Sequence, residues 1–298
     1  MNILHNFFSN NFEKSNEGIY ILDKEDDYTK NFGKQWKDYN TIQIDSFNNF
    51  DISKNFLKKI IFSEIENLKG KNILEIGCGA GRFTEYLAPI SNICVSIDLS
   101  SAIYYNVVKN SKNLFLVKAD FLKLISKKKF DVVICRGVLQ HTPNPFHSIL
   151  KLYEFVDKKG VVVFDIYSNP KIGLFHPKYF FWRPLINKIF TYENFEIFLK
   201  KNIKILLNVK RKIKYIFFNS NFISDLFIPV WDYKDKLILS EKQLEDWAIL
   251  DTLDGIYAKY DKPVNNNKLL KFLESNNIKL IKNNKINNIY MTQIKSID

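Results

Sequence analysis

A glycine-rich turn next to a carboxylate carries the strongest chemical signal in the sequence. The run Glu75-Ile76-Gly77-Cys78-Gly79-Ala80-Gly81 follows an apolar stretch, and its glycines let the backbone turn sharply and bring bare N–H groups against a ligand. A dinucleotide-binding fingerprint needs a third glycine where Arg82 stands, and Glu75 adds a negative charge two residues before the first glycine. Both departures disfavour a nicotinamide dehydrogenase. A carboxylate here suits a ligand that bears an ammonium and a sulfonium group rather than a pyrophosphate.

Two further acidic residues follow at the ends of the next apolar stretches. Asp98 closes the run 93–97, at about the separation at which an acidic side chain accepts both hydroxyls of a ribose. Asp120-Phe121 follows the next run, where a carboxylate could accept an adenine amino proton while the aromatic ring packs on the base. Each aspartate taken singly could equally cap the helix that follows it. Three such residues at the ends of successive strands favour a site for an adenosyl ligand.

The elements that must position these residues form a parallel sheet. Short β-branched runs alternate with helical patterns from residue 71 to about residue 167, which is typical of βαβ units. The runs are continuously apolar, as expected of strands that are buried on both faces. We predict strands over 72–76, 93–98, 114–118, 130–136 and 160–166, helices over 82–87 and 265–275, and a closing pair of strands over 278–281 and 289–294.

The run from Ile73 to Gly79 resembles the first motif of class I S-adenosylmethionine-dependent methyltransferases, and Asp98, Asp120-Phe121 and 130–134 resemble the later motifs in order and spacing. The resemblance implies an α/β fold with a Rossmann-like, seven-stranded, mostly parallel sheet, helices on both faces and an antiparallel last strand. It implies S-adenosylmethionine as the cofactor and S-adenosylhomocysteine as the product. The loop backbone would then lie beside the methionine moiety, Asp98 on the ribose, and Asp120 and Phe121 at the adenine. The cofactor-binding residues assigned in this way are Glu75, Gly77, Cys78, Gly79, Arg82, Asp98, Leu99, Asp120, Phe121 and Arg136.

A narrower likeness lies on the flanks of these motifs. Residues 32–36, 140–143 and 260–263 resemble a bacterial branch of the family that is often associated with surface-polysaccharide and other small-metabolite pathways. The resemblance covers about 32–165 and 251–294, and it leaves the intervening segment uncovered.

His141 is the candidate catalytic residue. Methyl transfer from a sulfonium is an in-line displacement, in which much of the rate comes from holding the nucleophile close and aligned. His141 follows the fourth strand, at the edge where the methyl group should lie, and would act as a general base where the nucleophile must lose a proton. The alternative is a histidine that caps or packs a loop. Arg136 ends the same strand and would hold an acidic substrate or the cofactor carboxylate, or else remain a surface residue.

Candidate substrate-binding residues come from three parts of the chain. Gln35, Trp36 and Tyr39 lie on an expected amino-terminal helix across the mouth of the pocket, where aromatic rings could exclude water or simply pack. His176 could reach the site from the intervening segment, although a structural role is favoured. Tyr257 and Tyr260 lie among aspartates and would bind substrate hydroxyls or form a polar turn.

The composition is that of a globular, basic protein. Of the 298 residues 46% are hydrophobic, and no run reaches the roughly 18 apolar residues of a membrane span. The three cysteines lack metal-ligand spacing and their odd number suits a reducing compartment, so we expect a cytoplasmic protein without a metal site. The formal charge is +12, and residues 171–220 hold eleven Lys or Arg against two Glu.

We predict three parts in the chain. Cap helices span 1–60, a methyltransferase core spans 61–168 and 251–298, and a basic, aromatic, helical insertion spans 169–250. Between Phe195 and Phe217 apolar and basic residues recur at helical spacing, as in a basic amphipathic helix. The favoured interpretation is a lid with solvated charges, and the other is peripheral contact with an anionic membrane or a lipid-linked, phosphate-bearing substrate.

The sequence therefore predicts methyl transfer from S-adenosylmethionine to an oxygen or nitrogen of a small-molecule or carbohydrate-type acceptor. An RNA methyltransferase is the alternative enzyme, and the basic charge is its sole support because no RNA-binding module is recognisable. A protein that binds an adenosyl ligand without catalysis is the alternative from another class.

Overall fold

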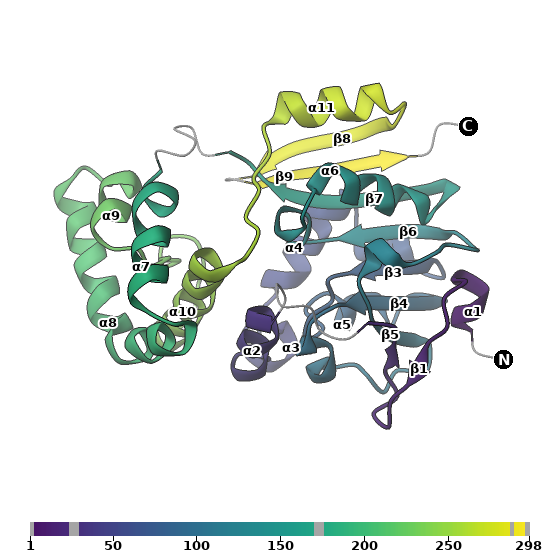
Figure 1. Cartoon of the computed structure of the whole chain (residues 1–298), viewed down its shortest axis with the longest axis horizontal. Coiled ribbons are helices and arrows are strands. Elements are labelled where there is room, and N and C mark those ends of the chain that lie inside the picture. The colour runs from purple at the N-terminus through teal and green to yellow at the C-terminus, as the bar shows by residue number, and fades with distance from the viewer. Residues whose placement is uncertain (1–2, 24–29, 170–175, 287–288, 296–298) are drawn as a thin grey trace. The chain divides into compact units, whose positions relative to one another are not determined.

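The chain divides into two structural units (Figure 1). The computed structural model describes residues 3–23, 30–169, 176–286 and 289–295. Met1–Asn169 together with Tyr260–Asp298 make up one unit, which we call the sheet unit, and Pro170–Lys259 make up the other, the helical unit. The expected core boundary at residue 251 falls inside helix α10 (Glu241–Tyr257) of the helical unit.

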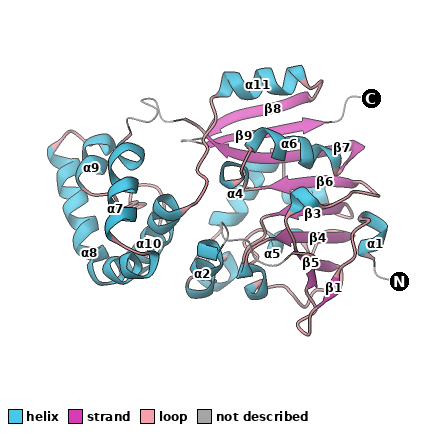
Figure 2. Cartoon of the chain, in the orientation of Figure 1, coloured by secondary structure: helices cyan, strands magenta, loops and turns pink. Residues whose placement is uncertain are grey.

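The sheet of the described residues has nine strands in the order β1-β2-β5-β4-β3-β6-β7-β9-β8 (Figure 2). The interior pairs from β5 to β7 are parallel, and β9 runs antiparallel to both of its neighbours, as the resemblance implied. The strands are β1 (Glu13–Lys14), β2 (Tyr20–Ile21), β3 (Asn72–Ile76), β4 (Ile93–Asp98), β5 (Leu114–Lys118), β6 (Phe130–Cys135), β7 (Val156–Tyr167), β8 (Lys279–Ile286) and β9 (Ile289–Lys295).

The predicted number of seven strands was too low. Two short strands from the amino-terminal segment add to one edge of the sheet, where Tyr20 pairs with Val117 and Ile21 with Lys118 in parallel register. The segment 1–60 therefore contributes strands as well as the expected helices. A two-residue strand contains no measurable alternation, so its sequence carries no signal of its own.

Helices cover both faces of the sheet because its strands place alternate apolar side chains on each side. On one face Leu74, Val95 and Val133 pack with residues of α1, α6 and α11, and on the other Ile73, Cys94 and other residues pack with α4, α5 and η2. Figure 1 shows α6 in front of the sheet and α4 behind it. The helices of this unit are α1 (Leu4–Phe7), α2 (Lys30–Asp38), α3 (Asp45–Asn48), α4 (Ile52–Ile61), η1 (Ile65–Leu68), α5 (Thr84–Leu87), η2 (Ser101–Tyr105), η3 (Phe121–Lys123), η4 (Leu139–His141), α6 (Pro145–Glu154) and α11 (Asn266–Ser275).

The helical unit is an insertion between β7 and the return of the chain to the sheet unit. Its described elements are η6 (Lys178–Trp182), a π-helical turn, α7 (Arg183–Ile189), α8 (Tyr192–Ile216), α9 (Asn221–Phe227) and α10. Side chains of Thr191 and Ser240 cap α8 and α10. None of the helices in the described part of the chain combines the length and apolar character that a bilayer span requires.

The two ends of the insertion are joined by hydrogen bonds within the sheet unit. The amide of Asn169 donates to the carbonyl of Val264 at 3.2 Å, and the amide of Val264 donates to the carbonyl of Tyr167 at 2.8 Å. The chain therefore leaves β7 and returns beside it, so residues 260–264 cross the carboxyl end of that strand.

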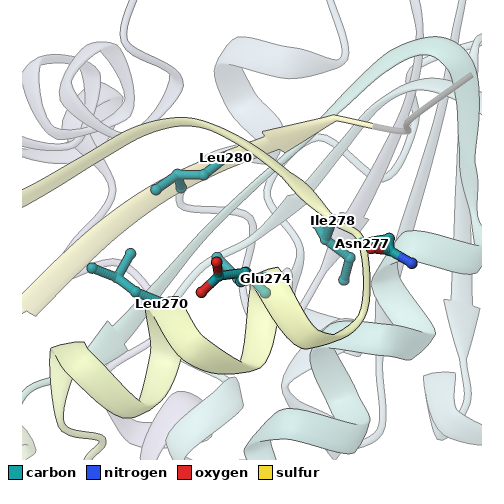
Figure 3. Close-up of a pocket in the computed structure, with 6 residues that line it drawn as sticks. Leu270, Glu274, Asn277, Ile278 and Leu280 are labelled. Carbon is teal, nitrogen blue, oxygen red and sulfur yellow. The ribbon is translucent and has the colours of Figure 1, made fainter.

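A largely apolar hollow lies between α11 and β8 (Figure 3). Leu270 and Glu274 of α11 and Leu280 of β8 are among its lining residues. Strands β7 and β9 separate β8 from β6, so this hollow is remote from the predicted cofactor loop.

Candidate functional site

The glycine turn leaves β3 at the middle of the sheet, where the carboxyl ends of β3, β4 and β6 lie side by side. Gly77 has φ +79° and Gly81 has φ +101°, values that residues with a Cβ rarely adopt. A Cβ on Gly77 would lie 2.1 Å from Cγ2 of Val138, which follows β6. Glycine at this position thus lets the turn pass close to the neighbouring loop.

Asp98 ties the turn to the next strand. Its Oδ2 accepts from the amide of Gly79 at 2.7 Å, and its Oδ1 accepts from the amide and hydroxyl of Ser100 at 2.8 and 2.7 Å. The amides of Gly77 and Cys78 donate to the carbonyl of Ile97 on the same strand. Asp98 therefore fixes the loop, and its contact with a ribose stays a prediction.

Glu75 is a buried carboxylate behind the loop. Its Oε2 accepts from the hydroxyls of Thr84 and Ser96, each at 2.7 Å, whereas its Oε1 has no hydrogen-bond partner among the described residues. Burial raises the pKa of Glu75 to about 7. Because an unpartnered buried oxygen costs about 1–3 kcal/mol, Glu75 marks a place where a cationic group would be stabilised.

Arg82 binds the amino-terminal segment. Its Nε donates to the hydroxyl of Ser53 at 3.0 Å and its Nη1 to the amide oxygen of Gln43 at 2.7 Å. Asp45 strengthens this contact by accepting from the hydroxyl of Tyr86 at 2.9 Å. The sequence interpretation missed this cluster, because nothing in the spacing of these residues links them. A cofactor contact of Arg82 stays a prediction.

The other predicted cofactor residues lie around the same edge. Asp120 caps η3 by accepting from the amide of Leu122 at 3.0 Å, which is the geometry of the capping alternative. Phe121 belongs to the core, and Cys78 and Leu99 are also buried. The adenine contacts of Asp120 and Phe121 stay predictions.

His141 lies at the carboxyl end of β6 with its tautomer set by a backbone group. Its Nδ1 is 2.9 Å from the carbonyl oxygen of Tyr260, and its ring meets that of Tyr167 edge to face. A carbonyl can only accept, so Nδ1 carries the proton and Nε2 of the neutral ring holds the lone pair. This arrangement suits a general base, and it equally holds the return segment in place.

Arg136 is held over the end of the same strand. Its Nε forms an ion pair with Asp165 at 3.3 Å, and its guanidinium carbon lies 4.4 Å from the centre of the Phe56 ring. Asp165 is fully buried and also accepts from the amide of Gly137 at 2.6 Å. Asp165 was not among the predicted site residues, since it lies within a strand that reads as core.

Two buried polar side chains, next to His141 and to Tyr167 in the sequence, have no hydrogen-bond partner in the part of the chain that the structure describes. The amide group of Gln140 is fully buried, and neither its oxygen nor its nitrogen is hydrogen-bonded among the described residues. The hydroxyl of Ser168, which follows β7, is also buried and has no hydrogen-bond partner among the residues described. The return segment, residues 260–264, passes both residues. The backbone amide of Lys262 donates to the backbone carbonyl of Gln140, and Val264 forms an isolated β-bridge with Ser168. Because buried polar groups in folded proteins are nearly always hydrogen-bonded, Gln140 and Ser168 are candidates to bond a ligand or a water molecule.

The predicted substrate residues divide between the two units. Gln35 and Tyr39 lie on and just after α2, which packs on η2 next to Asp98, and the Trp36 side chain lies outside the described residues. Tyr260 contributes its carbonyl to His141.

His176 and Tyr257 belong to the helical unit and bond within it. Nδ1 of His176 accepts from the amide of Lys178 at 3.3 Å, and burial lowers the pKa of this histidine. The hydroxyl of Tyr257 donates to the carbonyl of Phe190 at 3.1 Å, and burial raises its pKa to about 12. Their substrate contacts stay predictions.

Known proteins resemble part of the chain. A ubiquinone biosynthesis O-methyltransferase from Glaesserella parasuis is 32% identical over 114 residues, which are 35% of this chain and 48% of that protein. Its counterpart from Pseudomonas fluorescens is 32% identical over 116 residues, 37% of this chain and 50% of that protein. The chain thus spans about half the length of the curated relatives it matches.

Solved structures of methyltransferases show the same kind of partial likeness. The N-methyltransferase NodS from Bradyrhizobium japonicum, in complex with S-adenosyl-L-homocysteine, is 25% identical with a TM-score of 0.35, covering 39% of this chain and 61% of that chain. Magnesium protoporphyrin IX methyltransferase from Synechocystis, with the same molecule bound, is 13% identical with a TM-score of 0.44, covering 82% of each chain.

A family model decides the assignment. The model described as a methyltransferase domain matches residues 52–202, just over half of the 298 residues. The matched range contains the glycine turn, Asp98, Asp120 and His141. The chain therefore belongs to the methyltransferase domain family.

Proposed function

We propose that this chain transfers a methyl group from S-adenosylmethionine to an oxygen or nitrogen of a small-molecule or carbohydrate-type acceptor. The observation that carries the proposal is the glycine turn that Asp98 fixes in front of Glu75, whose buried Oε1 has no partner among the described residues. A ligand with an ammonium and a sulfonium group would stabilise that carboxylate.

The residues at the carboxyl edge of the sheet fit this cofactor. The glycine turn would lie beside the methionine moiety, Asp98 would accept ribose hydroxyls, and Asp120 and Phe121 would contact adenine. When bound, S-adenosylmethionine supplies an electrophilic methyl group. The chain's own contribution is to hold an acceptor in line with that group and to exclude water.

The acceptor would bind over the ends of β6 and β7. Nε2 of His141 would take a proton from an acceptor hydroxyl or ammonium, and Gln140 and Ser168 offer buried donors and acceptors that would orient it. The ubiquinone biosynthesis O-methyltransferases that the chain resembles support a small-molecule acceptor. The three buried, free cysteines support our inference of a cytoplasmic location.

Isothermal titration with S-adenosylmethionine and S-adenosylhomocysteine tests the proposal. We expect both to bind the full chain, and Asp98→Ala to abolish binding because the ribose contact and the anchor of Gly79 are both lost. Asp157→Ala is the matched control, since Asp157 is exposed at the start of β7 and should bind like the wild type. Circular dichroism would show whether Asp98→Ala is folded. Failure of the wild type to bind either compound would refute the proposal, and unchanged affinity of Asp98→Ala would refute the ribose assignment.

A further inference from the structure

One side of α8 and the turn that follows it expose basic and apolar side chains together. We propose that this surface binds an anionic lipid bilayer. We call it the basic aromatic face, and its residues are Ile197, Lys201, Lys204, Ile205, Lys212, Tyr215 and Ile216 on α8 and Phe217, Phe218 and Phe222 at the turn. The proposal concerns where the protein works and does not depend on its reaction.

The face is opposite to the side of α8 that holds the helical unit together. At about 100° per residue, the seven positions on α8 fall within an arc of about 120°. Phe195, Leu199, Ile203 and Leu207 form the opposite stripe, which is buried in the helical unit, where α8 packs with α9 and α10. Ile205 and Ile216, by contrast, are 64% and 66% exposed. The sequence suggested a single apolar stripe, whereas the helix carries a buried one and an exposed one.

Uncompensated positive charge accompanies these exposed apolar groups. Residues 197–224 contain seven Lys or Arg and no Asp or Glu. Lys210, Arg211 and Lys214 pair with the carboxylates of Asp225, Asp232 and Asp235, which stabilises the helical unit.

Three lysines on the face have no such partner. Lys201, Lys204 and Lys212 are exposed and form no ion pair among the described residues. A surface with lysines, apolar side chains and no carboxylate is complementary to anionic head groups above an acyl region.

The turn after α8 presents aromatic rings at a cost in backbone energy. Phe218 is 99% exposed and has φ +52°, a left-handed conformation that is unfavourable for a bulky residue. Phe217 directly precedes it in the sequence and Tyr215 lies three residues before it, and both are exposed. The amide of Asn219 donates to the carbonyl of Lys214 at 2.8 Å and closes the helix end around Phe218, but the Phe218 ring itself is left in solvent. Insertion into a bilayer interface would bury this ring.

The chemistry of the face favours lipid over nucleic acid. Single-stranded nucleic acids are bound by aromatic and arginine side chains that stack on bases. Here the exposed apolar groups on the helix are largely aliphatic, and Arg211 is occupied by Asp232 and Glu241. Aliphatic groups flanked by lysine and tipped by aromatic residues are typical of interfacial membrane binding.

Vesicle flotation of the full chain tests the proposal. We expect binding to vesicles of phosphatidylcholine with phosphatidylglycerol, weakening with salt, and little binding to phosphatidylcholine alone. The triple variant K201Q/K204Q/K212Q should bind at least roughly tenfold more weakly, since each lysine near the surface contributes roughly fivefold. The control K69Q/K112Q/K268Q removes the same charge from exposed lysines of the sheet unit and should bind nearly as the wild type.

A second variant separates loss of binding from loss of folding. Phe218→Asn should be as stable as the wild type or more stable, because asparagine tolerates the left-handed region, yet it should bind anionic vesicles roughly tenfold more weakly. Equal binding to neutral and anionic vesicles, or unchanged binding of both variants, would overturn the proposal. Failure of the protein to float with anionic vesicles would also overturn the proposal. In that case, lysine-dependent binding of polyuridylate RNA would assign the basic aromatic face to nucleic acid, and a dimer that Phe218→Asn dissociates would assign it to a second copy of the chain.

Discussion

Gly77→Ala puts a methyl group where the structure has no space for one. The residue has φ +79°, and its added Cβ would lie 2.1 Å from Cγ2 of Val138. The left-handed backbone costs a residue with a Cβ about 1–2 kcal/mol. Displacing Val138 from its packed position adds about 1–3 kcal/mol. We therefore expect the variant to lose about 2–5 kcal/mol in the free energy of unfolding, and to lose cofactor binding.

A second glycine separates the two contributions. Gly18 has φ +82°, and no described atom lies within 4 Å of the position that a Cβ would take there. Gly18→Ala should therefore cost only the backbone part, about 1–2 kcal/mol. Val138→Ala removes the Cγ2 atom, so the double variant with Gly77→Ala should show a favourable coupling of at least about 1 kcal/mol.

Urea unfolding of the four variants, followed by circular dichroism, measures these differences. The reasoning requires Gly77→Ala to be clearly less stable than Gly18→Ala and to be partly rescued by Val138→Ala. Equal losses at the two glycines, together with a coupling near zero, would refute it, because they would show that Val138 moves aside freely and that the turn is not held by its neighbour.

Three other variants test the site and the helical unit. Burial raises the pKa of Glu75 from 4.5 to about 7, so Glu75 binds a proton more tightly in the folded than in the unfolded chain. The free energy of unfolding that this proton adds is complete below about pH 4.5 and is lost as the pH rises through 7. Urea titrations should thus show the wild type losing about 3 kcal/mol relative to Glu75→Gln across that window, and parallel curves would contradict this. His141→Ala should lower turnover of a methyl acceptor by roughly 100-fold without changing cofactor affinity, and normal turnover would exclude the base role. Lys210→Met should destabilise the helical unit by about 2 kcal/mol, since Asp225 and the carbonyl of Val230 lose their hydrogen-bond donor. Lys204→Met, at an exposed position, should leave thermal unfolding unchanged. Equal effects of the two variants would contradict the buried role of Lys210.

The centre of the sheet could be predicted because its signal is local. Strands β3, β4 and β5 have the predicted bounds, since a continuous apolar run that ends in a glycine or an aspartate marks both the strand and its carboxyl end. Glu75 and Asp98 follow from the same pattern, because the ends of adjacent parallel strands must meet at one edge. The closing antiparallel strand was also predicted correctly.

The remainder depends on contacts between distant residues. Strand β2 forms through the pairing of Tyr20 with Val117, which lies 97 positions further along the chain. The hydrogen bonds of Arg82 to Gln43 and Ser53 likewise join residues that are far apart in the sequence. Similarly, the pattern of α8 shows where apolar residues recur, but α9 and α10 decide which of them are buried. No spacing rule along the chain contains that information.

The paired ends of the insertion have an evolutionary consequence. Because the amide of Asn169 donates to the carbonyl of Val264, the 90 residues of the helical unit leave and re-enter the sheet unit at neighbouring points. Such a junction allows the insertion to be exchanged for a shorter or unrelated segment. The ends of any segment placed between these two residues already lie side by side, so closing it costs little conformational entropy. Proteins that keep the same sheet unit can therefore acquire a new substrate specificity or a new location in the cell when this one segment is replaced.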